Sequence, residues 1–308
     1  MAVANTPRGD GTGKRLRALG ILLVMGLAWG LSFSLARVAA GGGMHPFSIT
    51  FWEALGAGTT LLIICLLRRR RIPLGRQLLL LYAASAALGM VVPNAIFFYA
   101  ASHVPAGILS ISLAVVPLIT FVVSAVLRLE RLAFGRVLGV ILGIVAIVLL
   151  VGPQESLPDP AQLPWVLLCV GAAACYASFN IMVSLWKPRG AASFTTTTAL
   201  FATAALLLVP VMSATGSFAA PAWPWTAVEW SLLGLGLINA IAFTLFVYLI
   251  DTAGPVFTSQ TANLVTLFGV LWGIVIFGER NSAWVWLSLA TMMLAIALVT
   301  PRRAQAVA

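Results

Sequence analysis

The chain has 308 residues, of which 61% are hydrophobic and only 8% are charged, and its mean hydropathy is +1.05. A soluble domain usually carries about 25% charged residues, so the composition excludes an ordinary soluble protein and indicates a membrane protein. The net charge of +10 does not indicate nucleic-acid binding, because the basic residues lie in short loops between apolar runs, where they direct membrane topology.

Ten apolar segments follow one another along the chain, separated by mostly short polar connections. A helix needs about 20 residues to cross the hydrocarbon layer of a bilayer, and the segments have about that length. The alternating pattern of a transmembrane barrel, in segments of about 10 residues, is not visible. We therefore expect an all-α integral membrane protein with ten transmembrane helices at residues 17–40, 46–67, 76–99, 105–127, 133–151, 163–185, 193–213, 229–251, 255–277 and 283–300.

The positions of the basic residues predict the orientation of these helices. If the N-terminus is cytoplasmic, 16 of the 18 Lys and Arg residues lie on the cytoplasmic side, and only Arg37 and Arg280 lie near or on the outside. Cytoplasmic loops of membrane proteins carry an excess of Lys and Arg. Both termini are therefore predicted to be cytoplasmic.

The two halves of the chain resemble one another. A shift of 149 residues places Glu130 on Glu279 and Tyr99 on Tyr248, and "AWGLSF" in the first segment resembles "CYASFN" in the sixth. Each copy holds five helices, an odd number, so the second copy must enter the membrane upside down, as in many transporters. The expected organisation is a cytoplasmic tail (1–16), a first five-helix repeat (17–151), an outer linker (152–162), a second, inverted repeat (163–300) and a cytoplasmic tail (301–308).

Several short motifs occur in a characteristic order: Trp29-Gly30 in the first segment, "VPAG", "PLITF" and "LERL" along the fourth, and "FGER" at the end of the ninth. In this order they resemble the EamA-like family of the drug/metabolite transporter superfamily over nearly the whole chain. The chain is most similar to bacterial exporters of amino acids, aromatic ones included. The resemblance implies transport across the bacterial plasma (inner) membrane. Thr266 departs from the pattern, since Pro117 occupies this position in the first copy.

Polar side chains within the membrane are costly, and usually face a cavity or a neighbouring helix. Ser259, Asn263 and Thr266 recur with the spacing i, i+4, i+7, so they share one helix face. This face could line a cavity or hydrogen-bond to a packed helix. The candidate substrate-binding residues are Trp29, Ser32, Asn94, Tyr99, Ser112, Tyr176, Asn180, Asn239, Thr244, Ser259, Asn263 and Thr266.

Few charged residues fall within the segments. Arg37 and Glu53 lie near the outer ends of the first two helices, where they could pair across the outer mouth as a structural contact or a gate. We expect an uncharged, polar and aromatic cavity, suited to a neutral or zwitterionic solute, and without a deep carboxylate facilitated flow is favoured over ion coupling. Glu279 is interpreted as a structural corner that satisfies the free N–H groups of the next helix.

These features predict a secondary transporter that works by alternating access. The chain has no ATP-binding GxxxxGK[ST] loop, and His45 and His103, its two histidines, lie in predicted outer loops without HExxH or GxSxG motifs. We therefore expect no enzyme activity, catalytic residue, metal or cofactor. The expected partners are a small-molecule substrate and the lipid bilayer, with no nucleic acid, and a monomer fits this description. The alternatives are a multidrug or nucleotide-sugar carrier and, more distantly, a channel or an intramembrane enzyme.

Overall fold

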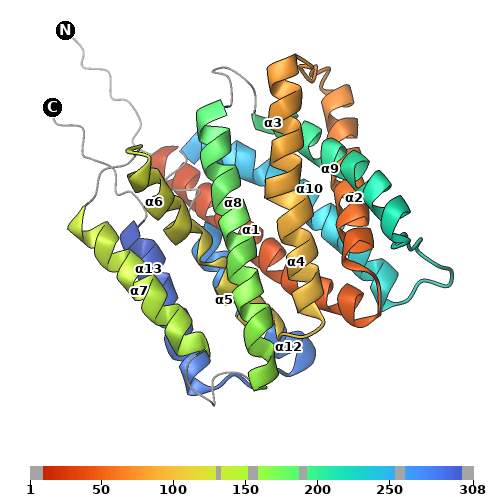
Figure 1. Ribbon diagram of the computed structural model, residues 1–308. Helices are drawn as coiled ribbons and strands as arrows, with labels where there is room; N and C mark the ends of the chain where they lie inside the picture. The colour runs from red at the N-terminus through yellow and green to blue at the C-terminus, as the bar shows by residue number, and fades with distance from the viewer. Residues whose placement is uncertain (1–9, 130–132, 152–158, 187–192, 254–260, 300–308) are drawn as a thin grey trace, which may run out of the picture.

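The computed structural model describes residues 10–129, 133–151, 159–186, 193–253 and 261–299, and the regular elements in these ranges are all helical (Figure 1). The first half contains α1 (Asp10–Gly41), α2 (Pro46–Leu67), α3 (Arg76–Ala86), the π-helical η1 (Ala87–Val91), α4 (Val92–Ala101), α5 (Ala106–Leu113), α6 (Val116–Val126) and α7 (Phe134–Val151). The second half contains η2 (Pro160–Gln162), α8 (Leu163–Trp186), α9 (Ser193–Thr215), α10 (Ala227–Ala253), α12 (Thr261–Phe277) and α13 (Ala283–Val299).

The predicted apolar segments coincide with these helices to within a few residues, except that α1 already begins at Asp10, before the first segment (17–40). Among the described residues, seven helical stretches are long and apolar enough to cross a membrane, and three shorter apolar helices lie at Phe134–Leu150, Thr261–Phe277 and Ala283–Val299. Residues 255–260 of the ninth predicted segment and residue 300 of the tenth lie outside the described residues. The structure therefore agrees with an all-α membrane protein.

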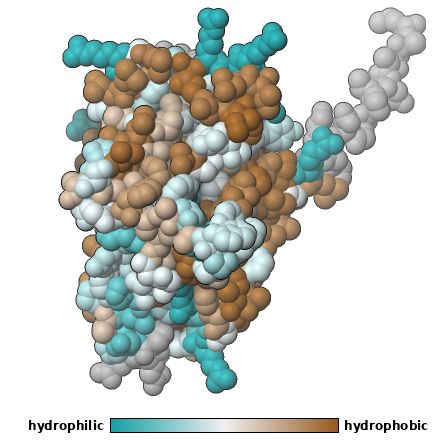
Figure 2. Space-filling model, turned by 90° about the vertical axis from the view of Figure 1, so that its right-hand side faces the viewer, coloured by the Kyte–Doolittle hydropathy of each residue, from teal (hydrophilic) through white to brown (hydrophobic). Residues whose placement is uncertain are grey.

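The surface of the bundle is apolar where a soluble protein would be polar. Leu66, Leu206 and Val275 are each about 70% exposed, with relative exposures of 67%, 71% and 72%. Figure 2 shows hydrophobic side chains over much of one face, with hydrophilic side chains projecting at its upper and lower ends. Soluble monomers rarely expose large contiguous apolar patches, so this surface is suited to lipid.

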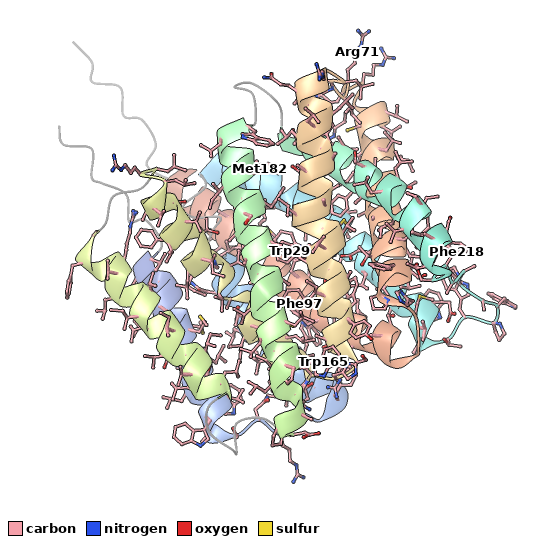
Figure 3. All side chains as sticks on the ribbon, in the orientation of Figure 1. Trp29, Arg71, Phe97, Trp165, Met182 and Phe218 are labelled. Carbon is pink, nitrogen blue, oxygen red and sulfur yellow. The ribbon has the colours of Figure 1, made fainter. Side chains whose placement is uncertain are left out.

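The two ends of the bundle differ in charge. At one end, here named the arginine end, Arg68 to Arg71 follow α2, Arg128 follows α6, and Arg136 lies in the first turn of α7. The opposite end, here named the α1–α2 end, contains the turn between α1 and α2. Figure 3 shows Arg71 at the arginine end and Trp165, near the start of α8, at the other. The arginines therefore distinguish the two membrane faces of the bundle.

The first helices of the two halves run in opposite directions. Helix α1 runs toward the α1–α2 end, whereas α8 begins there, where the ring of Trp165 stacks on His103 at 4.0 Å between centroids. The halves also interleave, since α1 packs along α12 and α10, α2 along α9 and α10, and α7 along α13. Most of the packing surface of α1 and α2 is thus supplied by the other half of the chain.

Two prolines interrupt helices that the sequence predicted to be continuous. Proline has no backbone N–H and cannot donate to the carbonyl four residues earlier. Before Pro93 the chain forms the π-helical η1, in which the N–H of Val92 donates to the carbonyl of Ala87. Before Pro117 the helix breaks between α5 and α6. Both breaks occur beside the central cavity described below, and π-helical segments are frequent at functional sites.

Close packing of α1 against α12 depends on a glycine. A Cβ atom added to Gly30 would lie 2.8 Å from the Cβ of Phe268 and 2.9 Å from the backbone nitrogen of Gly269. We expect Gly30→Ala to lower the free energy of unfolding by about 1–3 kcal/mol, because the two backbones must separate. Thermal unfolding in detergent, followed by tryptophan fluorescence, measures this loss. Gly20→Ala is the matched control on the same helix, because a Cβ there would meet nothing within 4 Å; equal melting temperatures for the two variants would contradict the prediction.

Candidate functional site

A central cavity of about 640 Å³ lies between the two halves of the chain. It reaches Ala36 and Leu109 near the α1–α2 end and Ser124 and Arg136 near the arginine end. Its volume falls within the range of about 300–1,000 Å³ that small-molecule sites occupy. Aromatic side chains from four helices form much of its wall: Phe97 and Phe98 of α4, Phe179 of α8, Phe201 of α9, and Phe243 and Phe246 of α10.

A chain of polar groups in the cavity wall converges on Glu53 of α2. The indole Nε1 of Trp29 donates to Oδ1 of Asn239 at 3.1 Å, and Nδ2 of Asn239 donates to Oε1 of Glu53 at 2.5 Å. From the other side, the hydroxyl of Tyr176 donates to Oδ1 of Asn94, whose Nδ2 donates to Oε2 of Glu53 at 2.7 Å. Five helices, α1, α2, α4, α8 and α10, thereby meet at one carboxylate.

The orientation of the network follows from its chemistry. An indole N–H can only donate, so Trp29 requires the oxygen of the Asn239 amide, and the amide nitrogen of Asn239 is then directed to Glu53. The residues Glu53 and Asn239 retain relative exposures of 5% and 7%. In the described part of the chain, no basic side chain lies within ion-pair distance of Glu53. The site therefore holds a buried carboxylate with hydrogen-bond donors but no counter-charge.

The structure brings seven of the predicted substrate-binding residues to the cavity. Some of them belong to the polar network, and others stand apart from it; Ser32 Oγ, for example, is buried without a hydrogen-bond partner within the described ranges. The residues that line the cavity are Trp29, Ser32, Asn94, Tyr176, Asn180, Asn239 and Thr266.

Three of the other predicted residues do not line the cavity. Ser112 is fully buried and donates to the carbonyl of Ile108, and Thr244 donates to the carbonyl of Ala240. Tyr99 is 50% exposed and packs against Trp165. Their spacing along the sequence did not predict the direction in which each helix face points.

The residues predicted to share one face of α12 do not all line the central cavity. Thr266 lines the central cavity, whereas Asn263 lines a separate apolar groove beside Leu19 and Leu23 of α1. Ser259 lies outside the described residues. Asn263 therefore faces the apolar groove and Thr266 the central cavity, although the two residues are only three positions apart.

The predicted pair of Arg37 with Glu53 is wrong. Arg37 instead forms a salt bridge with Glu279, and its guanidinium carbon lies 4.4 Å from the centroid of the Phe277 ring. Glu53 lies on the buried face of α2 and contributes to the cavity. The expectation of an uncharged cavity is also wrong, because the carboxylate of Glu53 lines the cavity.

Glu279 stabilises a helix other than the one expected. Its carboxylate accepts hydrogen bonds from the backbone N–H groups of Ala106 at 2.8 Å and Gly107 at 3.2 Å, at the start of α5. The first N–H groups of a helix have no partner within the helix, and its N-terminus favours negative charge. The carboxylate of Glu279, in the second half of the chain, therefore binds the start of α5 and Arg37 of α1 in the first half. It caps α5 and not α13, the helix that follows it.

The most important site residue that the sequence interpretation misplaced is Glu53, and a signal for it was present. Ile49, Glu53, Ala57 and Leu61 recur every four residues and are all buried in α2. A carboxylate within such a stripe must face the protein interior. The aromatic lining gave no such signal, because phenylalanines in an apolar helix look alike whether they face lipid or a cavity.

Comparison with known proteins also indicates a membrane transporter built from two related halves. The model of the EamA-like transporter family matches the chain twice, at residues 16–152 and 163–300. The uncharacterized inner membrane transporter YedA of Escherichia coli K12 is 26% identical over 294 residues, which cover 92% of this chain and 91% of YedA; YedA from strain O157:H7 matches equally. A solved crystal structure shares the fold with a TM-score of 0.61 at 19% identity, covering 92% of this chain and 96% of the other. None of these descriptions names an amino-acid substrate.

Proposed function

The chain belongs to the EamA-like transporter family, and from that premise we propose that it exports neutral or zwitterionic small metabolites, most of all amino acids, aromatic ones included. It is a multi-pass transporter of the bacterial inner membrane. The observation that carries the proposal is the central cavity, which combines an aromatic wall with a polar network and is built from both halves of the chain. Aromatic walls suit aromatic side chains, and the polar groups suit an amino-acid backbone.

Transport in this proposal proceeds by alternating access through ten transmembrane helices arranged as two inverted repeats. The opposite directions of α1 and α8 support the inversion. The positive-inside rule assigns the arginine end to the cytoplasm. The cavity reaches toward that end, while Arg37 and Glu279 join helices at the other. In this proposal substrate enters the cavity from the cytoplasm.

A multidrug carrier for organic cations is the second candidate, and Glu53 is the observation that favours it. A carboxylate in an aromatic cavity suits a lipophilic cation as well as an amino acid. The same carboxylate disfavours a nucleotide-sugar substrate, because it would repel the phosphates. Arg136, at the far end of the cavity, is the basic residue in the described lining.

Uptake into proteoliposomes tests the proposal. We expect saturable counterflow of radiolabelled phenylalanine, tryptophan or another amino acid, assayed with and without a pH gradient, because a carrier must exchange labelled for unlabelled substrate. Protein-free liposomes are the control. Transport of drugs or sugars with no transport of any amino acid would contradict the substrate assignment.

A further inference from the structure

The carboxylate of Glu53 has unused capacity for hydrogen bonds. A carboxylate offers about four acceptor positions, and two of them receive the amide nitrogens of Asn94 and Asn239. Glu53 also lines the cavity, so its remaining acceptor positions can serve a ligand that enters there. The network therefore holds the carboxylate in place without saturating it.

Among the residues that the structure describes, no basic side chain pairs with Glu53. In the described lining of the cavity, the other titratable or charged side chains are Tyr176 of α8, which donates to Asn94, and Arg136 of α7, which lies 5.6 Å from the centroid of the Phe121 ring at the far end. Arg37 of α1 lies outside this lining and pairs with Glu279. A buried charge without a partner is strongly unfavourable. A ligand that brings a positive charge to this position would therefore gain a strong interaction.

The amide orientations favour an ammonium group over a metal ion. Sodium, calcium and magnesium ions require several oxygen ligands, but the Oδ1 atoms of Asn94 and Asn239 are occupied by Tyr176 and Trp29. The groups that face Glu53 are N–H donors, which repel a metal ion. A primary ammonium instead needs acceptors for its own N–H groups, and Glu53 offers its remaining acceptor positions in the cavity.

We propose that Glu53 is the subsite that binds the protonated primary amine of the transported substrate. The proposal rests on the proposed function and deepens it, because it names the chemical group that the cavity requires. The aromatic wall, including Trp29 and Phe243 in edge-to-face contact at 5.3 Å, surrounds the remainder of the substrate. Solutes of similar size that carry a carboxylate but no amine are excluded by repulsion from Glu53.

Competition in proteoliposomes tests the subsite. Counterflow of radiolabelled phenylalanine is measured against two fragments of that molecule, phenethylamine, which keeps the amine, and 3-phenylpropionate, which keeps the carboxylate. We expect phenethylamine to inhibit the wild type and 3-phenylpropionate to have little effect. In Glu53→Gln, inhibition by phenethylamine should weaken roughly 10- to 100-fold, because a charge-assisted hydrogen bond is lost. Glu53→Asp should recover part of the inhibition.

The matched control is Glu229→Gln. Glu229 is a buried carboxylate at the start of α10 that bonds to Thr226 and does not line the cavity. This variant should keep the inhibition pattern of the wild type. Stronger inhibition by 3-phenylpropionate than by phenethylamine, or unchanged inhibition in Glu53→Gln, would overturn the proposal.

A second measurement does not depend on transport or on folding of the variants. A hydrophobic carbodiimide modifies membrane carboxyl groups, and mass spectrometry reports the modified fraction of Glu53 in the purified wild-type protein. Phenethylamine should protect Glu53 at least several-fold better than 3-phenylpropionate at the same concentration, and equal protection would refute the subsite. Protection by phenethylamine in a protein that transports no amino acid would refute the proposed substrate class while the amine subsite stands.

Discussion

Replacement of Glu279 by alanine is expected to lower the free energy of unfolding by about 3 kcal/mol, because several partly buried donors lose a charged acceptor at once. The side chain of Glu279 is only 7% exposed, and its carboxylate accepts from Ala106, Gly107 and Arg37 together. Its removal leaves two helix N–H groups and one guanidinium without their acceptor. Thermal unfolding in detergent measures the loss.

Arg37→Ala is the comparison for this prediction. The side chain of Arg37 is 33% exposed, and without it Glu279 still accepts from the two backbone N–H groups at the start of α5. We therefore expect a clearly smaller loss of stability than for Glu279→Ala. Equal losses would show that the salt bridge, and not the cap of α5, supplies the stabilisation.

Replacement of Asn239 or Trp29 by alanine is expected to reduce transport roughly tenfold or more, measured as kcat/KM for uptake into proteoliposomes. Without Asn239, the indole of Trp29 and one oxygen of Glu53 both lose their hydrogen-bond partner in the cavity. An unsatisfied buried polar group costs about 1–3 kcal/mol, and the loss falls on the surface that binds the substrate.

Trp284→Ala provides the control for these variants. Trp284 lies in the first turn of α13, is 37% exposed and does not line the cavity. Its replacement should leave transport within about twofold of the wild type, because surface substitutions away from a site usually have small effects. Equal losses for Trp284→Ala and Asn239→Ala would contradict the assignment of the cavity.

Helix positions could be predicted from the sequence because each span is encoded locally. A run of apolar residues and its flanking charges are sufficient to define a membrane helix, and the structure agrees within a few residues over the described ranges. The irregularities were only partly foreseen. A proline inside a helix generally disturbs it, but the sequence did not indicate that the chain would become π-helical before Pro93 and break before Pro117.

The site was harder to predict because depth along a helix says nothing about rotation around its axis. Tyr99 and Asn94 are five residues apart in α4, yet Asn94 bonds to Glu53 and Tyr99 is half exposed. Contacts between distant segments carry no local signal at all. Arg37 was assigned to Glu53 because the two helices are adjacent in sequence, whereas its partner Glu279 is 242 residues away.

The interleaving of the two halves has a consequence for the biogenesis of the protein. Trp272 of α12 donates to the carbonyl of Leu27 in α1, across a separation of 245 residues. At about 5–20 residues per second, a ribosome needs on the order of 10–50 s to synthesise that interval. During this time α1 and α2, with Trp29 and Glu53, reside in the bilayer before their partners in the second half of the chain exist. The nascent first half is therefore the stage at which a chaperone or a neighbouring lipid has the greatest influence on folding.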